Sequence, residues 1–283
     1  MSAGTSTTHS PSVAGTAAPR RRRDAPPPAR LLANLAAPAV FGVLFLTAWE
    51  LFVRLRHIKP FLLPRPSAIW GELHGNASLI AKAARVSGTN ALVGLVLGAA
   101  AGIAVAFAAS RFRVLRKLVT PMAVAVSAMP IIVVASVLYN LLSNTSQVPR
   151  RIMAAIVVFF VVFVNVAKGL TEVTAAQVEL MRSYAATDTD ILRKVRVPNA
   201  LAHLFTALKV AAPLAVITAF VSEYFGGLQD GLGYRITSNI SNSKDAVAWA
   251  YVAGAISLGL LFYLVAVTLE RLAMPSQARR RRD

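Results

Sequence analysis

A charged stretch, VELMRSYAATDTDILRKVRVPNAL (residues 178–201), interrupts two strongly apolar regions of this 283-residue chain. The regions on either side are apolar enough to lie in lipid, whereas this stretch carries seven charged side chains: Glu179, Arg182, Asp188, Asp190, Arg193, Lys194 and Arg196. A plain connector between two membrane helices needs only about two to eight residues. The length and the charge therefore predict a folded element outside the membrane.

The first half of this element has the periodicity of a short helix. Over residues 174–184, Val178 and Met181 fall on one face with Ala185 at three- and four-residue spacing. Glu179 falls on a different face. We therefore predict an amphipathic helix that lies against the membrane surface.

The second half has the signals of another helix start. Thr187 or Asp188 can accept a backbone N–H as the capping residue, and Asp190 then lies in the first turn, where an acidic side chain is favoured. The basic residues follow toward the C-terminal end, and Pro198 is expected to end the helix. The pair is either a simple connector between membrane spans or a docking element for a cytoplasmic partner.

Composition places the chain among membrane proteins. Hydrophobic residues make up 56% of the chain and charged residues 15%, against about 25% charged in an average soluble domain. The net charge of +18 is partly concentrated in two clusters, Arg20–Arg23 and Arg279–Arg282. Such clusters beside apolar segments favour contact with lipid head groups, and the lack of interleaved aromatic residues argues against nucleic acid as a partner.

The chain lacks the residue patterns of the common catalytic and metal sites. It has no cysteine, so disulfides and thiolate metal sites are excluded. It has no phosphate-binding Gly-Lys-Ser/Thr loop, no His-Glu-x-x-His pattern and no plausible Ser-His-Asp group. We therefore expect a protein that is not an enzyme and that needs no metal or cofactor, so energy for any transport must come from a partner or a gradient.

The apolar segments predict an all-α, polytopic membrane protein with about six spans. The candidate spans are Pro38–Val53, Val86–Ala109, Val119–Leu142, Ile152–Ala167, Leu208–Phe225 and Ala246–Leu269. We expect a disordered basic tail at 1–30, a transmembrane domain at 31–274 with its polar loop at about 168–205, and a basic tail at 275–283. The segment RLRHIKPF after the first apolar run offers no small-residue cleavage site, so we expect a retained span rather than a signal peptide.

Positive charge predicts the orientation of these spans. With the N-terminus placed in the cytoplasm, the inner segments hold 20 of the 30 Lys and Arg residues and the outer segments hold 10. This is the bias that the positive-inside rule requires. Both termini and the stretch 178–201 are then expected on the cytoplasmic side of the cell membrane.

The stretch 178–201 resembles the cytoplasmic loop of ABC importer permeases, in which Glu-Ala-Ala is followed by Gly and later by Pro. Glu179 takes the Glu position, Ala185 the Gly position and Pro198 the closing position. The segments WELFVRLRHIKPFLLPRPSAIW (49–70) and FVSEYFGGLQDGLGYRI (220–236) resemble the branch that serves nitrate, sulfonates, taurine and pyrimidine precursors. The resemblance covers about residues 40–270. In three places the chain departs from the pattern: Ala185 replaces Gly, Asn90 stands where that branch has Arg, and LLSNTSQVPRR (141–151) replaces a Phe-Gly and a short turn to Lys after the third span.

This resemblance implies a type I (MetI-like) ABC importer permease that carries a small solute of those classes. It implies three kinds of protein partner: cytoplasmic ATPase subunits, an extracytoplasmic solute-binding protein, and a second permease copy that is either identical or related. The residues that would contact the ATPase are Glu179, Arg182, Ser183, Tyr184, Ala185, Asp188, Asp190 and Pro198. A secondary transporter or channel, or a membrane scaffold that recruits a cytoplasmic partner, remains as an alternative.

Several residues inside the spans are further candidates. Gly94, Gly98 and Gly102 form a small-residue ladder that favours close helix packing. Met129 and Pro130 predict a kink within the third span. Polar side chains in or near spans are candidates for the pathway or its gate. These are Tyr139, Asn140, Asn165, Ser222 and Glu223.

Overall fold

The computed structural model describes residues 28–112, 117, 121, 129–143 and 145–274, with side chains from residue 36 onward. Within these residues every regular element is a helix, as the sequence predicts. The two tails predicted at the ends of the chain lie almost wholly outside the described residues. By its internal contacts the chain divides into two units, residues 1–48 and residues 49–283.

Helix α1 (Pro28–Leu55) begins in the first unit and ends in the second. Its part Ala36–Leu55 has 20 residues and a mean hydropathy of 1.8, which is sufficient to cross a bilayer. The large apolar side chains from Val40 to Leu46 are exposed, as contact with lipid requires.

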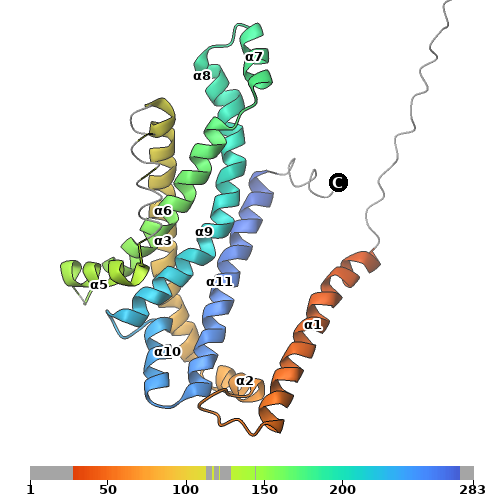
Figure 1. The fold of residues 1–283 in the computed structure, drawn as a ribbon, viewed down its shortest axis with the longest axis vertical. Coiled ribbons are helices and arrows are strands. Elements are labelled where there is room, and N and C mark those ends of the chain that lie inside the picture. The colour runs from red at the N-terminus through yellow and green to blue at the C-terminus, as the bar shows by residue number, and fades with distance from the viewer. Residues whose placement is uncertain (1–27, 113–116, 118–120, 122–128, 144, 275–283) are drawn as a thin grey trace, which may run out of the picture. The chain divides into compact units, whose positions relative to one another are not determined.

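The second unit is built around four long helices that run side by side (Figure 1). They are α3 (Ala77–Arg111), α6 (Val148–Thr171), α9 (Val197–Phe225) and α11 (Asp245–Ala273). Helix α6 packs between α3 and α9, and α11 packs on α9. Small residues make the contact of α9 with α6 close, because Ala207, Ala211 and Ala215 lie in one buried cluster with Val158 and Val162.

The glycine ladder lies at the contact between α3 and α6. A Cβ atom added to Gly94 would stand 2.4 Å from the Cβ of Ala154, and one added to Gly98 would stand 2.4 Å from the backbone oxygen of Ala155. At Gly102 the distance to the Phe159 oxygen would be 2.9 Å. The two backbones are therefore as close as glycine allows.

Five helices in the described part of the chain are long and apolar enough to span a membrane: α1, α3, α6, α11 and the continuous helix Asp188–Phe225. They correspond to five of the six predicted spans. The remaining prediction, Val119–Leu142, lies partly outside the described residues, and its described end forms the 12-residue helix α5 (Ile131–Leu142).

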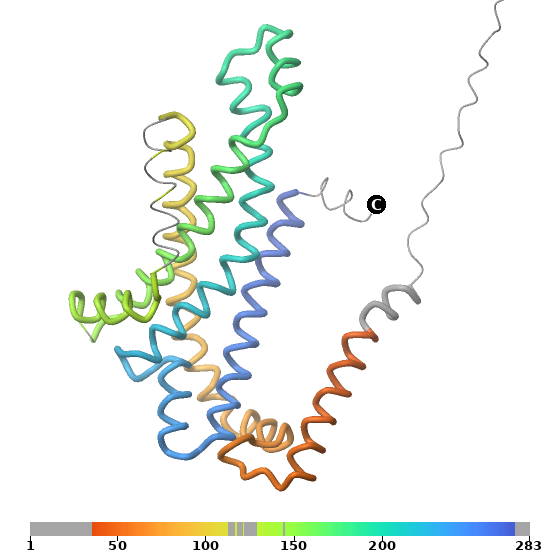
Figure 2. Tube along the Cα trace, viewed as in Figure 1, coloured from red at the N-terminus to blue at the C-terminus, as the bar shows by residue number. Residues whose placement is uncertain are grey.

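Short helices occupy the two ends of the four-helix bundle. Helices α7 (Ala175–Ser183) and α8 (Asp188–Ile191) lie at one end, and α2 (Pro66–Gly75) and α10 (Leu232–Ser241) lie at the other (Figures 1 and 2). The predicted polar loop and the segment after α9 are therefore separated by the length of the bundle.

Candidate functional site

The stretch 174–196, called the hairpin below, folds as two short helical segments joined by a turn. Its first helix, α7, begins with a reciprocal cap: Thr174 Oγ1 accepts from the Gln177 N–H, and Gln177 Oε1 accepts from the Thr174 N–H, both at 3.3 Å. Such caps satisfy backbone donors that a helix start otherwise leaves free. The helix predicted over 174–184 is confirmed.

The turn after α7 places Ala185 in the left-handed region, with φ of +55°. The Ala185 N–H donates to Arg182 O at 2.9 Å, and the Ala186 N–H donates to Met181 O at 3.1 Å. These two bonds form the Schellman arrangement that glycine usually completes at a helix end. Ala185 therefore adopts a positive φ, which the glycine of the family motif would adopt at this position without strain.

Replacing Ala185 by Gly is expected to leave the free energy of unfolding unchanged or to raise it by up to about 1 kcal/mol. A left-handed conformation costs an L-residue about 1–2 kcal/mol, and the entropy loss of Gly offsets part of that gain. Thermal unfolding of the purified protein measures the effect. Ala186→Gly in the next position, which has no positive φ, serves as the control and should be destabilising. A clear loss of stability in Ala185→Gly would contradict the strained turn.

The second half of the hairpin starts at Thr187, which forms a reciprocal cap with Asp190. The Asp190 N–H donates to Thr187 Oγ1 at 3.2 Å, and the Thr187 N–H donates to Asp190 Oδ2 at 3.2 Å. This confirms the predicted helix start and assigns the cap to Thr187 rather than to Asp188. Asp190 also pairs with Lys194 at 3.3 Å.

The prediction that Pro198 ends this second helix is wrong. Helix α8 continues through a π-helical turn, Leu192–Arg196, directly into α9, where Pro198 occupies the first turn. In the π-helical turn the Val197 N–H bonds to Leu192 O, five residues earlier. This wider turn relieves the clash and the missing donor that a proline imposes on an α-helix, so the chain continues as one helix.

The outer face of the hairpin is exposed. Glu179, Arg182, Ser183 and Asp188 are all exposed to solvent. Two apolar side chains accompany them, because Leu180 is 57% and Tyr184 is 78% exposed. Val178 and Met181, which were predicted for the inner face, are half-buried.

The base of the hairpin is tied to both flanking long helices by a residue that the sequence analysis did not single out. Asn199 Nδ2 donates to Gly169 O at 2.8 Å and to Glu172 O at 3.1 Å, which joins the start of α9 to the end of α6. Gly169 allows this contact, since a Cβ there would stand 2.7 Å from the Cα of Ala200. In the sequence, Asn199 could have been recognised only by its position next to Pro198, the residue that closes the family motif.

A cavity of about 430 Å³ lies beside the middle of α6, with α5 forming its other wall. Two of the predicted pathway residues line it, Met129 and Asn165. Pro130 lies next to the lining as the residue that precedes α5. We predicted a kink at Met129 and Pro130, but residues 122–128, on its N-terminal side, lie outside the described residues. Asn140 is exposed elsewhere on α5 and bonds to Ser136 O of its own helix at 2.8 Å.

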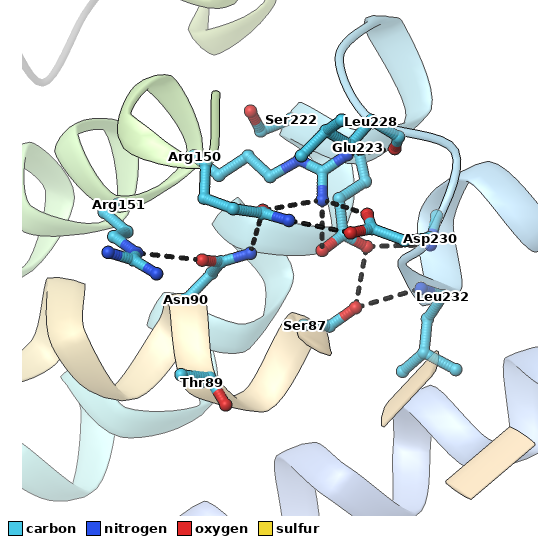
Figure 3. Close-up of polar contacts among 12 residues, drawn as sticks. Ser87, Thr89, Asn90, Arg150, Arg151, Ser222, Glu223, Leu228, Asp230 and Leu232 are labelled. Atoms are coloured by element: carbon cyan, nitrogen blue, oxygen red, sulfur yellow. Dashed lines mark hydrogen bonds and ion pairs between the residues drawn. The ribbon is translucent and has the colours of Figure 1, made fainter. Parts of the chain in front are cut away.

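The end of the bundle opposite the hairpin contains a buried polar network (Figure 3), which consists of Ser87, Asn90, Gln147, Arg150, Glu223 and Asp230. Arg150 is fully buried and Glu223 is 2% exposed. Arg150 Nη1 lies 2.7 Å from Asp230 Oδ1 and 3.8 Å from Glu223 Oε1. Its Nη1 also donates to Gln147 Oε1 at 2.9 Å, and its Nη2 donates to Leu228 O.

Glu223 joins three elements through one carboxylate oxygen (Figure 3). Its Oε2 accepts from Ser87 Oγ of α3 at 2.7 Å and from the Gly233 N–H of α10 at 3.1 Å. Ser87 Oγ in turn accepts from the Leu232 N–H at 2.9 Å. A side chain at Gly231 would collide with this carboxylate, because a Cβ there would stand 2.1 Å from the carboxyl carbon. The buried acid therefore explains the first glycine of the Gly-Leu-Gly run after α9, and the close approach of the Phe220 backbone oxygen, 2.3 Å from a Cβ at Gly233, explains the second.

Tyr139 connects α5 to the same end of α9. Its hydroxyl donates to Ser222 O at 3.1 Å and lies 3.0 Å from Ser222 Oγ. Its ring covers Gly227, whose φ is +91°, and a Cβ there would stand 2.8 Å from the ring. The structure thus brings Tyr139, Ser222 and Glu223 together, and separates them from the cavity residues Met129 and Asn165.

Arg150, Asp230 and Gln147 were missed by the sequence analysis, which counted Arg150 only as an outer-loop charge. Asn90, noted there as a departure from the family pattern, accepts from Arg151 Nε at 3.1 Å and donates to Gln147 at 2.7 Å. The buried arginine of this network is therefore Arg150 on α6, whereas α3 contributes the amide of Asn90 at the position where the family branch has Arg. A charged residue at the border of an apolar span was the available signal.

Comparisons with known proteins agree with this architecture. The family described as binding-protein-dependent transport system inner membrane component matches residues 94–277. A probable ABC transporter permease protein of Haemophilus influenzae is 26% identical over 230 residues, which is 81% of this chain and 93% of that protein.

A second relative and a solved structure extend the comparison. The formylaminopyrimidine transport permease protein ThiX of Halalkalibacterium halodurans is 26% identical over 239 residues, covering 84% of this chain and 94% of that protein. A chain of the inward-facing MetNI methionine ABC transporter shares the fold, with a TM-score of 0.57 and 17% identity over 70% of this chain and 97% of that chain. The family match over most of the chain, on a fold of several apolar helices, shows that this multi-pass membrane protein belongs to the binding-protein-dependent transport system inner membrane components, the permease subunits of ABC importers.

Proposed function

We propose that this chain forms half of the translocation pathway of an ATP-driven importer for a small solute, together with a second copy of itself or a related permease. The relative whose name states a substrate carries formylaminopyrimidine, and the sequence resemblance adds nitrate, sulfonates and taurine to the classes considered. An external solute-binding protein would deliver the solute. The chain's own residues provide the path and the coupling, and a partner hydrolyses ATP.

In this proposal the hairpin is the docking element for cytoplasmic ATPase subunits. The observation that carries the proposal is the continuity of α8 with α9 through the π-helical turn. Because the hairpin is capped in both halves and tied to α6 by Asn199, a push on its exposed face moves α6 and α9 together. The excess of Lys and Arg on the same side of the predicted spans supports a cytoplasmic position for it.

The exposed face of the hairpin suits a protein partner. It offers two apolar side chains, Leu180 and Tyr184, surrounded by charges of both signs. Exposed aromatic residues with a polar rim are typical of residues that dominate binding in protein interfaces. A simple connector does not require such a pair of apolar groups, so their presence together supports a docking role.

The double substitution Glu179→Lys and Asp188→Lys is expected to reduce copurification of the ATPase subunit and solute transport by at least about tenfold, since one interfacial charge reversal costs more than about 1.4 kcal/mol. Both side chains are exposed, so the protein should still insert and fold. Copurification and uptake into proteoliposomes measure the two effects. Tyr184→Ala should weaken ATPase binding in the same direction without changing the local charge.

Glu172→Lys provides the matched control, because this side chain is 56% exposed at the same end of the bundle but precedes the hairpin. It should retain ATPase binding and transport. If the double variant and Tyr184→Ala both bound the ATPase normally and transported normally, the docking function of the hairpin would be excluded.

A further inference from the structure

The cavity between α5 and α6 has the size and position of a solute site. Its volume of about 430 Å³ falls within the range of about 300–1,000 Å³ that is usual for small-molecule sites. Its α6 lining runs from Met153 to Asn165, which is the central part of a helix that extends from Val148 to Thr171. The cavity therefore lies along the part of α6 between the buried network of Arg150 and the hairpin.

The wall of this cavity carries no charge among the described residues. Apart from Asn165, every lining side chain is apolar, and Met129, Val134, Phe160 and Val161 are representative. The sequence extends this property, because residues 129–149 and residues 152–167 contain no Asp, Glu, Lys or Arg. Both segments that bound the cavity are therefore free of charge along their whole apolar length.

Among the described residues, the cations that flank this lining along α6 are engaged elsewhere. Beyond its far end, Lys168 lies 3.7 Å from Glu172. Arg150 is fully buried in its pairs with Asp230 and Glu223. Arg151 donates from Nε to Asn90. Neither residue lines the cavity. A small anion that entered would lose hydration without gaining a cationic partner, which costs several kcal/mol.

The same wall is suited to an uncharged ring. Phe160 offers an aromatic face, and the thioethers of Met129 and Met153 are polarizable groups that pack well against aromatic rings. Asn165 adds one polar group: its Nδ2 donates to Val161 O at 2.8 Å. No described residue donates to its carbonyl oxygen, which can therefore act as the acceptor for an N–H of the solute.

We propose that this cavity is the mid-membrane solute site of the pathway and that it takes a neutral, ring-sized organic solute with an N–H donor, rather than an inorganic anion or a sulfonate. The inference rests on the import function proposed above and narrows its substrate class. A neutral aminopyrimidine fits this description, whereas nitrate and taurine, the one an anion and the other doubly charged, do not.

The absence of cysteine from the chain permits a direct test. Val157 lines the cavity, and Val157→Cys introduces a single thiol there with little change in volume. In proteoliposomes the full chain with its ATPase would be treated with neutral methyl methanethiosulfonate or with the anionic sulfonatoethyl or cationic trimethylammonioethyl reagents. We expect the two charged reagents to react at least about 30-fold more slowly than the neutral one, which corresponds to about 2 kcal/mol of lost solvation.

Ser183→Cys on the exposed face of the hairpin is the control, and after opening of the vesicles it should react with all three reagents at rates within a few-fold of each other. Equal or faster reaction of Val157→Cys with the anionic reagent would overturn the proposal. Failure of Val157→Cys to react with any reagent would overturn it as well, because the cavity would then be closed to solutes.

A transport measurement separates this inference from the import function itself. With ATPase, binding protein and ATP present, uptake of labelled nitrate and taurine should stay at background, and uptake of either above background would refute the neutral-solute site while leaving an importer. If the ATPase subunit did not copurify with the unmodified chain, the import function itself would be refuted. The two failures are therefore distinguishable in one preparation.

Discussion

Arg150→Met is expected to lower the free energy of unfolding by about 3–5 kcal/mol, because it leaves the buried carboxylate of Glu223 without its cation. Arg150 is fully buried, lies 2.7 Å from Asp230 and 3.8 Å from Glu223, and also bonds to Gln147 and Leu228. Methionine preserves much of the apolar stem but supplies none of these donors. Titration of the purified protein with a denaturing detergent, followed by circular dichroism, measures the loss.

The double variant Arg150→Met, Glu223→Gln tests whether the unpaired charge is the cause. Removing the charge of Glu223 together with that of Arg150 should restore part of the lost stability, since a buried neutral amide is far less costly than a buried unpaired carboxylate. If the double variant were as unstable as Arg150→Met, the loss would have to come from packing alone.

Arg54→Met is the matched control for the same change at an exposed pair. Arg54 lies 2.8 Å from Glu50, closer than Arg150 lies to Glu223, but its side chain is 58% exposed. Water screens such a pair, so the change should cost less than about 1 kcal/mol. Equal losses for Arg54→Met and Arg150→Met would contradict the importance of burial.

Features encoded by neighbouring residues could be predicted from the sequence. The hairpin depends on caps whose two members are three residues apart, such as Thr187 with Asp190, and five spans follow from continuous apolar runs. The strained turn at Ala185 could not be predicted from the sequence alone, because the sequence shows an alanine where the family pattern has glycine but does not give its φ.

The buried network could not be predicted in the same way, because its partners are distant in the chain. Ser87 and Glu223 are 136 residues apart, and Arg150 and Asp230 are 80 residues apart. Read locally, Arg150 is an ordinary flanking charge after a polar loop. Only the packing of α3, α6 and α9 shows that it is enclosed.

The wrong prediction that a helix ends at Pro198 has a similar origin. A proline excludes an ordinary α-helical bond but not a helix, and the π-helical turn before it supplies the alternative. The proline is visible in the sequence, whereas the π-helical turn that accommodates it is a property of the folded chain, in which Asn199 joins the start of α9 to Gly169 of α6.

Gly98→Ala is expected to lower the free energy of unfolding by about 2–3 kcal/mol, because one methyl group forces α3 and α6 apart. The new Cβ would stand 2.4 Å from the backbone oxygen of Ala155 and 2.8 Å from the Cβ of Val158, and neither atom is the end of a flexible side chain. The same detergent titration measures this loss.

Gly259→Ala supplies the opposite case within the same molecule. Gly259 lies inside α11, and a Cβ there meets nothing within 4 Å. Alanine should therefore leave stability unchanged or raise it by up to about 1 kcal/mol through its higher helix propensity. Both substitutions add the same methyl group to a glycine inside a helix, so both gain the same helix propensity. A stability loss at Gly98 but not at Gly259 can therefore be assigned to the close approach of α3 and α6. If Gly98→Ala were as well tolerated as Gly259→Ala, the contact between α3 and α6 would have to be looser than the glycine ladder requires.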